Sequence, residues 1–192
     1  MEMFDLYDNK GNLLNKVAPR GSSLNEGEFH LVVHIWIRNS KGEYLIQKRS
    51  KTTDKIFGMW ASTAGAAITG DTSLKAAIRE TYEEIGLMLN EDELKLLKRY
   101  YIKDSKASYI TDLYLVKRDV LLKDLKLDKL EVSECDFKTI EEIKVMIKNN
   151  QFWNYAKLLE RLDYIETLEK SWDNESIIYW WCIWNKRYGS TL

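Results

Sequence analysis

The chain has 192 residues, of which 45% are hydrophobic and 31% are charged, and these values exclude a disordered chain, a collagen-like repeat and a coiled coil. Its 29 basic and 30 acidic residues leave a net charge of −1, so the sequence predicts neither nucleic acid nor a membrane surface as a partner. The length predicts one domain with an appendage rather than two full domains.

The sequence shows no pattern typical of a secretory signal, a membrane-spanning helix, a disulfide framework or a zinc site. The first residues lack the basic start and apolar run of a secretory signal, so we expect a cytoplasmic protein. The longest apolar run late in the chain, Ile177 to Trp184, has eight residues, against the roughly 20 that a membrane-spanning helix needs. Cys135 and Cys182 are far apart and near no pair of histidines, which predicts two free thiols rather than a disulfide or a zinc site.

Strand patterns come first along the chain. Residues 29–38 and 44–49 are rich in β-branched and aromatic side chains, and the turn residues 39–42 separate them, which predicts a hairpin. The small apolar segment 60–67 follows.

The first clear helix is expected over 74–85. A cluster of side chains able to cap a helix, 70–73, precedes it. Gly86, the residue type favoured just past a helix end, follows it.

Two more strands are expected over 94–103 and 108–118, and two helices over 139–147 and 152–168, where apolar residues recur at helical spacing. Strands and helices alternate irregularly along the chain. The pattern therefore favours an α/β or α+β sandwich with a mixed or mostly antiparallel sheet over a doubly wound fold.

Three carboxylates share one face of the helix expected over 74–85. Glu80, Glu83 and Glu84 stand at i, i+3 and i+4, where neighbouring Cβ atoms are about 5–6 Å apart and like charges repel. A divalent cation would remove that repulsion, because Mg²⁺ prefers carboxylate oxygens. Arg79 can reach a neighbouring carboxylate with its planar guanidinium and orient it.

A second pair of glutamates in the chain has a different explanation. Glu142 follows Thr139 by three residues, which fits a capping box at a helix start, where the helix dipole also favours negative charge. Glu83 and Glu84 instead lie in the last turn before Gly86, where the dipole disfavours them. Capping therefore does not explain this pair, which leaves metal binding and solvated surface charge as interpretations.

The spacing of these residues resembles the Nudix hydrolase signature, a loop-helix-loop motif. In the segment GAAITGDTSLKAAIRETYEEIGL the matching positions are Gly65, Arg79, Glu80, Glu83, Glu84, Gly86 and Leu87. Two positions depart from the signature, since Asp71 stands where the family has Glu and Thr81 replaces an apolar residue. Asp71 is interpreted either as a metal-site residue or as a helix cap, and the Thr81 hydroxyl is expected to bond a carbonyl one turn earlier.

The resemblance extends beyond the motif. Residues 28–49 and 57–60 are similar to Nudix proteins related to isopentenyl diphosphate isomerase. This likeness implies a Nudix domain over 1–170, with a central mixed sheet between helices in an α/β/α sandwich. The tail 171–192 does not match and holds four of the seven tryptophans. It predicts either a final element packed on the domain or a lid or homodimer contact.

The resemblance also implies an activity. It implies Mg²⁺-dependent hydrolysis, with Mn²⁺ as the alternative ion, of a diphosphate that joins a nucleoside to another moiety, or of a related pyrophosphate. The small-molecule substrate would be cleaved by water attack at phosphorus. The implied metal ligands are Glu80, Glu83 and Glu84, with the carbonyl of Gly65 as a further candidate.

Catalytic roles are expected for Glu83, Glu84 and Arg79. Glu84 is the expected general base, and Glu131 and Glu134, after the last expected strand, are the alternatives.

Substrate contacts are expected before the motif. In the Nudix proteins related to isopentenyl diphosphate isomerase, which this stretch resembles, an Arg and a Lys meet a diphosphate, and the resemblance implies Arg49 and Lys55 here. Trp60 is interpreted as a stacking wall or as a core residue. His30 and His34 lie four residues apart in an expected strand, about 13 Å, so they cannot share one metal ion.

Three other functions compete with hydrolysis. The isomerase has a cysteine next to the motif glycine, whereas Ala64 precedes Gly65 here and Cys135 is distant in the sequence. A non-catalytic ligand sensor on the same fold is disfavoured by the intact carboxylates. RNA decapping is disfavoured because the balanced charge offers no broad basic track.

Overall fold

The computed structural model describes residues 1–50, 56–103, 108–155 and 158–168. The chain divides into two compact units, Met1–Trp153 and Asn154–Leu192. The first unit contains all the labelled strands and helices, and in the second unit residues 158–168 are helical.

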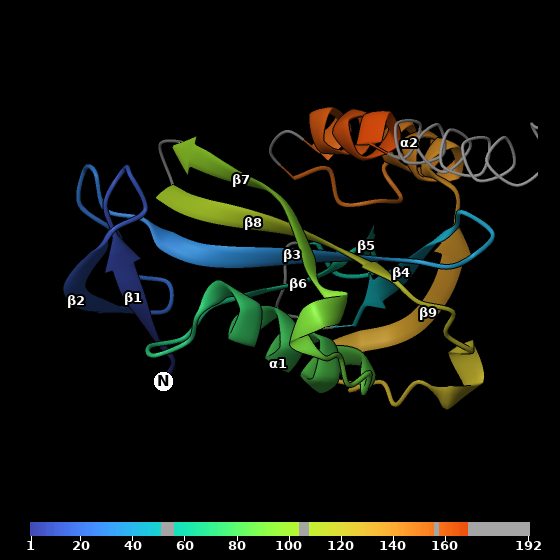
Figure 1. Cartoon of the computed structure of the whole chain (residues 1–192), viewed down its shortest axis with the longest axis horizontal. Coiled ribbons are helices and arrows are strands. Elements are labelled where there is room, and N and C mark those ends of the chain that lie inside the picture. The colour runs from blue at the N-terminus through green and yellow to red at the C-terminus, as the bar shows by residue number, and fades with distance from the viewer. Residues whose placement is uncertain (51–55, 104–107, 156–157, 169–192) are drawn as a thin grey trace, which may run out of the picture. The chain divides into compact units, whose positions relative to one another are not determined.

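The strands of the first unit are β1 (Met3–Tyr7), β2 (Leu13–Pro19), β3 (His30–Arg38), β4 (Tyr44–Arg49), β5 (Trp60–Ala61), β6 (Thr63–Ala66), β7 (Lys95–Lys103), β8 (Ser108–Lys117) and β9 (Val132–Lys138). Its helices are α1 (Ser73–Ile85) and α2 (Ile140–Lys148), with short 3₁₀ turns at Glu91–Glu93 and Leu122–Asp124. Strands β1 to β6 come before helix α1, and strands β7 to β9 come between α1 and α2 (Figure 1).

The main sheet is mixed, as the sequence predicts. Its order is β5-β4-β3-β8-β7, with β6 added to β3 and β9 added to β4. Strands β3 and β8 run parallel, and the other pairs are antiparallel. The predicted hairpin of β3 and β4 is confirmed at its turn, where Arg38 lies opposite Tyr44. Beyond the turn β3 pairs with β6 and β8, while β4 pairs with β5 and β9.

Two parts of the sheet structure were not expected from the sequence. Strands β1 and β2 form a separate two-stranded sheet at the start of the chain. Strand β9 begins at Val132, so Glu134 lies on a strand and not in the loop where it was expected. Glu131 lies in the turn just before β9.

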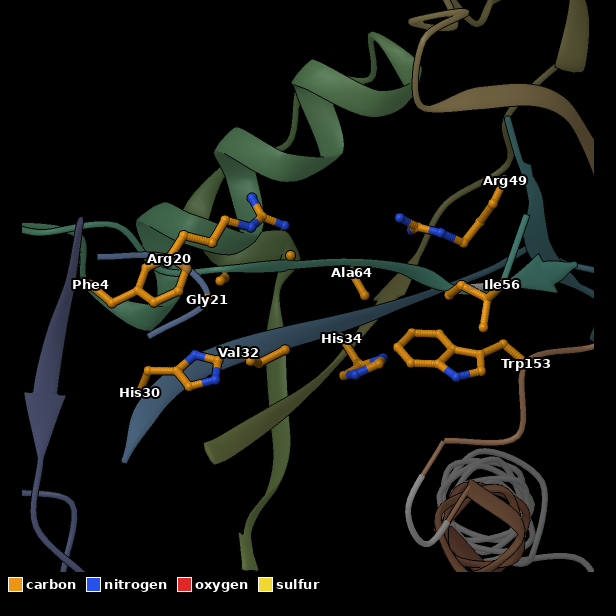
Figure 2. Close-up of a pocket in the computed structure, with 12 residues that line it drawn as sticks. Phe4, Arg20, Gly21, His30, Val32, His34, Arg49, Ile56, Ala64 and Trp153 are labelled. Atoms are coloured by element: carbon orange, nitrogen blue, oxygen red, sulfur yellow. The ribbon is translucent and has the colours of Figure 1, made fainter. Parts of the chain in front are cut away.

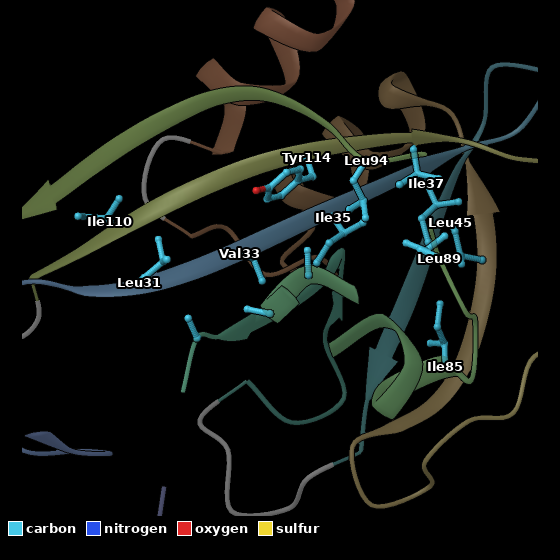
Figure 3. Packing of buried hydrophobic residues seen from close by; sticks show 14 of the residues in the cluster. Leu31, Val33, Ile35, Ile37, Leu45, Ile85, Leu89, Leu94, Ile110 and Tyr114 are labelled. Carbon is cyan, nitrogen blue, oxygen red and sulfur yellow. The ribbon is translucent and has the colours of Figure 1, made fainter. Parts of the chain in front are cut away.

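The core lies between β3 and α1. Alternate side chains of β3, including Val33 and Ile35, point toward α1, where Ala77 and Ile85 are fully buried (Figure 3). Alternation along a strand sends the residues between them to the opposite face. There Trp36 is fully buried against Phe152, with ring centroids 6.3 Å apart.

The two labelled helices lie on opposite sides of the main sheet, which gives the α+β sandwich predicted from the sequence (Figure 1). Helix α2 begins with the predicted capping box, in which Thr139 and Glu142 exchange hydrogen bonds. Its apolar residues Ile140, Ile143 and Ile147 are buried.

Helix α1 has well-defined ends. The Thr72 side chain accepts a hydrogen bond from the backbone N–H of Lys75, so Thr72 is the N-cap. Gly86 ends the helix in the left-handed region with φ of 68°. The Thr81 hydroxyl donates to the carbonyl of Ala77 at 2.7 Å, as predicted, and so satisfies a buried polar group.

The helix expected over 152–168 begins later than predicted. Phe152 forms an isolated bridge with Trp60, and helical structure is seen over 158–168. Cys135 is a free thiol, as expected, whereas Cys182 and the tryptophan-rich tail 171–192 lie outside the described residues. Within the described ranges, the chain has no helix that is long and apolar enough to span a membrane.

Candidate active site

The carboxylate of Glu80 packs directly against Gly65. A Cβ atom added to Gly65 would lie 1.9 Å from Cδ of Glu80 and 2.2 Å from each of its carboxylate oxygens. Gly65 has no left-handed φ angle, so space and not backbone conformation requires a glycine here. This glycine therefore lets a carboxylate of α1 approach strand β6 closely.

Arg79 ties three acidic side chains together. Its Nη1 donates to Oε1 of Glu80 and to Oε2 of Glu83, each at 2.9 Å. Its Nε and Nη2 donate to Oδ2 of Asp71 at 3.1 and 3.0 Å, and Nη2 also donates to the carbonyl of Ala66. Asp71 is thus not the N-cap of α1, which is Thr72. Its carboxylate accepts two hydrogen bonds from Arg79 and so fixes the direction of that side chain.

Glu84 is buried, with only 6% of its surface exposed. Its Oε2 accepts a hydrogen bond from Nε2 of Gln47 at 2.7 Å, and the hydroxyl of Thr63 donates to Oε1 of that glutamine. Burial raises the pKa of Glu84 to about 8, although the Gln47 hydrogen bond opposes the rise. Burial also raises the pKa of Glu80, and the charge of Arg79 opposes that rise.

These carboxylates line a cavity of about 310 Å³, called the acidic cavity below. Its lining consists of Glu2, Arg20, Arg49, Ala64, Gly65, Arg79, Glu80, Glu83, Glu84, Asp128 and Glu131. The cavity brings together five charged residues of α1 and of the turn before β9 that the sequence predicts as site residues or as alternatives. They are Arg79, Glu80, Glu83, Glu84 and Glu131. Sequence reasoning missed Asp128 and Arg20, because neither belongs to the motif.

Asp128 reaches the acidic cavity because the chain runs back along the end of α1. The backbone N–H of Lys126 donates to the carbonyl of Ile85, and that of Asp128 donates to the carbonyl of Glu84, each at 3.0 Å. A Cβ added to Gly86 would lie 2.9 Å from the Lys126 carbonyl oxygen, so a glycine is needed for this approach as well as for the helix end. Only the pairing of these distant segments reveals Asp128.

The two alternative bases lie in different places. Glu131 lines the acidic cavity, and its Oε2 lies 3.9 Å from Nη2 of Arg49. Glu134 is not among the residues that line this cavity, and it pairs with Lys48 at 3.8 Å.

A second cavity of about 610 Å³, called the apolar cavity, adjoins the first (Figure 2). Its lining consists of Phe4, Arg20, Gly21, His30, Val32, His34, Arg49, Ile56, Ala64, Gly65, Ala66 and Trp153. Arg20, Arg49, Ala64 and Gly65 line both cavities. A charged cavity and a larger, mostly apolar one therefore meet along β6.

The Nudix domain family model matches residues 28–162. The chain belongs to the Nudix family. A Nudix hydrolase of Listeria monocytogenes is 37% identical over 81% of this chain and 90% of the relative. The isopentenyl-diphosphate Delta-isomerase of Pectobacterium atrosepticum is 27% identical over 69% of this chain and 75% of the relative. The crystal structure of DR0079 from Deinococcus radiodurans has a TM-score of 0.66 at 20% identity, covering 84% of this chain and 98% of that one.

This Nudix protein is an enzyme of the pyrophosphohydrolase type, which acts on small-molecule substrates. Nudix enzymes generally use divalent metal ions. The donor chemistry of the acidic cavity fits such an ion, because its acids offer the hard oxygen ligands that Mg²⁺ and Mn²⁺ take. Gly65 adds to the fit by giving the Glu80 carboxylate room beside β6.

Side-chain directions differ from those of a closed metal site. Among the described residues, no three His, Cys, Asp or Glu side chains gather closely enough to hold one ion. In this structure Arg79 donates hydrogen bonds to Glu80 and Glu83, and Gln47 donates one to Glu84. Ion binding in this Nudix protein would therefore require these carboxylates to turn.

The other predicted substrate residues have mixed positions. Arg49 lines both cavities, whereas Lys55 lies outside the described residues. Trp60 lines neither cavity, and Nζ of Lys48 lies 5.8 Å from the centre of its ring. Trp153, whose backbone N–H donates to the carbonyl of Trp60, lines the apolar cavity instead.

Proposed function

We propose that this Nudix enzyme hydrolyses a diphosphate linkage between a nucleoside and another moiety, or a related pyrophosphate, by attack of water at phosphorus. The observation that carries the proposal is the acidic cavity, where α1 carboxylates face two arginines at the border of a larger apolar cavity. Carboxylates suit a cation, arginines suit phosphate oxygens, and the apolar cavity has the volume of a small-molecule site.

Mg²⁺, with Mn²⁺ as the alternative, is the proposed cofactor. Glu80, Glu83 and Glu84 would hold it, with the carbonyl of Gly65 as a further candidate. The ion would neutralise charge on the diphosphate and lower the pKa of water. Arg79 keeps Glu80 and Glu83 on the cavity side of α1, and Asp71 in turn keeps Arg79 in place.

Two carboxylates of the acidic cavity are candidates for the general base. Glu84 is buried and held by Gln47, which fixes its position but occupies one of its oxygens. Glu131 has 29% of its side chain exposed and lies beside Arg49, where water can reach it. A carboxylate near the attacking water can accept its proton in either case.

The isomerase alternative gains no support from Cys135, the cysteine within the described residues. Cys135 lines neither the acidic nor the apolar cavity. Burial, and then the nearby Glu84 carboxylate, raise the pKa of its thiol to about 12, which leaves it protonated at neutral pH.

The proposal is tested by a panel of nucleoside diphosphate conjugates and simple pyrophosphates, assayed for phosphate or mononucleotide release with and without Mg²⁺. We expect Mg²⁺-dependent release from at least one compound. Glu84→Gln should abolish most of it, with a loss of kcat on the order of 100-fold or more, as is typical when a base or metal ligand is removed. Glu134→Gln, an acid of β9 outside the cavity, is the matched control and should retain wild-type activity.

Glu131→Gln separates the two candidate bases. If Glu131 accepts the proton, its variant should lose the alkaline plateau of kcat while keeping KM, whereas a base at Glu84 leaves the Glu131→Gln pH profile unchanged. Absence of turnover across the whole panel, together with tight binding of one compound, would overturn the hydrolase proposal in favour of a ligand sensor.

A further inference from the structure

Two arginines from distant parts of the chain border both cavities. Arg20 follows strand β2, and Arg49 ends strand β4. Figure 2 shows their side chains extending toward each other from opposite ends of the apolar cavity, with Ala64 between them in the view. Burial raises the pKa of both Glu80 and Glu84, and the two arginines oppose this rise at different carboxylates, Arg20 at Glu80 and Arg49 at Glu84.

Arg20 is positioned by two hydrogen bonds to Glu2. Its Nη1 bonds Oε2 of Glu2, and its backbone N–H donates to the carbonyl of the same residue. Its side chain nevertheless remains 58% exposed, so the guanidinium keeps donors available to a ligand. The antiparallel pair of β1 and β2 thus places the Arg20 guanidinium at the border of the two cavities.

The apolar cavity has a distinctive charge. Among the described residues that line it there is no Asp or Glu. Its buried His30 stacks on Phe4, with ring centroids 5.1 Å apart. Burial, and then the charge of Arg20, lower the pKa of His30 to about 4, so this ring is neutral at pH 7. Among the described residues that line it, the side chains with a permanent charge are thus Arg20 and Arg49, and the rest of the lining is mostly aromatic and aliphatic.

We propose that Arg20 binds the diphosphate together with Arg49 at the border of the two cavities, and that the apolar cavity selects diphosphate esters whose organic group is uncharged and apolar over those whose organic group is cationic. This inference rests on the proposed function and adds a specificity-determining residue from outside the Nudix motif. Two arginines on one diphosphate give charge-assisted hydrogen bonds, and the same two charges repel a cation that enters the apolar cavity. The cavity volume of about 610 Å³ is ample for an aromatic or aliphatic substituent.

The test is calorimetric binding to the full-length protein in EDTA, which separates binding from turnover. The probes are benzyl diphosphate and 2-aminoethyl diphosphate, which share the diphosphate and differ in the charge of the substituent. We expect wild type to bind the benzyl ester at least about 10-fold more tightly than the aminoethyl ester. Equal affinity for the two esters, or no binding of the benzyl ester, would overturn the inference.

The Arg20→Gln variant tests the residue itself. It should weaken binding of the benzyl ester by about 10-fold or more, and Arg20→Lys, which keeps the charge but lacks the fork, should fall between it and wild type. Lys103→Gln is the matched control, because Lys103 pairs with Glu26 at the surface and lines neither cavity. Unchanged affinity in a folded Arg20→Gln protein would contradict the inference.

Arg20 also contacts Glu2, so its glutamine variant is checked by thermal unfolding. If that variant loses stability, Arg20→Lys decides, since it retains a cation for Glu2 and should still bind the benzyl ester roughly 3-fold more weakly than wild type. Wild-type affinity in Arg20→Lys together with an unfolded Arg20→Gln would assign Arg20 a structural role and overturn the inference. Neither outcome depends on hydrolysis, so failure here is distinct from failure of the proposed function.

Discussion

Gly65 shows how a single missing side chain shapes the candidate site. The carboxylate of Glu80 occupies the space where a Cβ would stand, and Arg79 then links Glu80 to Glu83. Sequence reasoning found Gly65 through the motif spacing and considered only its carbonyl as a ligand. Its close contact with Glu80 depends on how α1 packs on β6, which local sequence does not encode.

Gly65→Ala should impair activity by displacing Glu80. The fold should survive, because Gly65 has no left-handed φ angle, and the added methyl meets a side chain and not backbone. We expect Gly65→Ala and Glu80→Gln each to lower kcat/KM by about 10-fold or more, and the double variant to be no worse than the poorer single variant. Additive losses in steady-state kinetics would mean that Gly65 does not act through Glu80.

His30 should make folding stability depend on pH. Its folded pKa of about 4 lies below the usual value of 6.5, so the unfolded chain binds the proton more readily. The stabilising contribution is complete above pH 6.5 and is lost as the pH falls toward 4. Between pH 7 and pH 5 the loss should be about 2 kcal/mol.

Urea unfolding of wild type and His30→Phe at both pH values measures this contribution. The phenylalanine keeps a ring to stack on Phe4 and cannot titrate. Its free energy of unfolding should therefore fall by about 2 kcal/mol less than that of wild type over this pH range. An equal fall in the two proteins would show that His30 is not the group responsible.

Helix α1 is the element that organises the site, and both its ends are marked by glycine. Gly70 precedes its N-cap and Gly86 follows its last residue, and both have left-handed φ angles. They differ in their surroundings, since a Cβ on Gly70 meets nothing within 4 Å and a Cβ on Gly86 meets the backbone of Lys126. Alanine at Gly70 would therefore add only backbone strain, whereas alanine at Gly86 would add the same strain and a steric clash with Lys126.

Gly86→Ala should destabilise the protein more than Gly70→Ala. Each change forces alanine into the left-handed region at a cost of about 1 kcal/mol, and only Gly86→Ala also pushes away the segment that carries Asp128. We expect an excess loss on the order of 1–2 kcal/mol in urea unfolding, with reduced turnover for Gly86→Ala alone. Equal stability and turnover of the two variants would refute the role given to the Lys126 contact.

The helices and strands that the sequence predicts are marked by patterns within their own residues, whereas the strands that it misses are not. Helix α1 and strands β3 and β8 carry long apolar patterns with clear turn or capping residues, and they form as expected. Strand β9 is half exposed and pairs with β4 over a long sequence separation. Strand β2 is mostly exposed and pairs only with β1. Their pairing depends on tertiary partners, which a single sequence does not reveal.

At the scale of the whole molecule, a balanced net charge conceals a strongly patterned surface. The chain carries −1 overall, yet acids of α1 and of the turn before β9 gather in one cavity beside Arg20, which follows β2, and Arg49, which ends β4. The motif predicted the α1 acids and the stretch before it predicted Arg49. Arg20 and Asp128 lie 108 residues apart in the sequence (128 − 20), and neither belongs to a local pattern that predicts a site.

The sequence also predicts, as one alternative, a contact between two copies of the chain. The predicted homodimer contact or lid lies in the tail 171–192, outside the described residues, and it stays a prediction, as do the domain limits 1–170 and the cytoplasmic location. Light scattering of the full-length protein tests the dimer directly, because a dimer has twice the 22.7 kDa mass of the chain. A concentration-independent mass equal to one chain would contradict the dimer.

The α1 carboxylates are proposed to bind a divalent cation, and calorimetric titration of Mn²⁺ into the full-length protein measures that binding without turnover. Methylenediphosphonate is included because water does not cleave its P–C–P bridge. Wild type should bind Mn²⁺, and Glu83→Gln should bind it at least about 10-fold more weakly. Glu141→Gln, which changes an exposed glutamate at the start of α2, should match wild type. Equal binding by all three proteins, or no binding by wild type, would contradict the account.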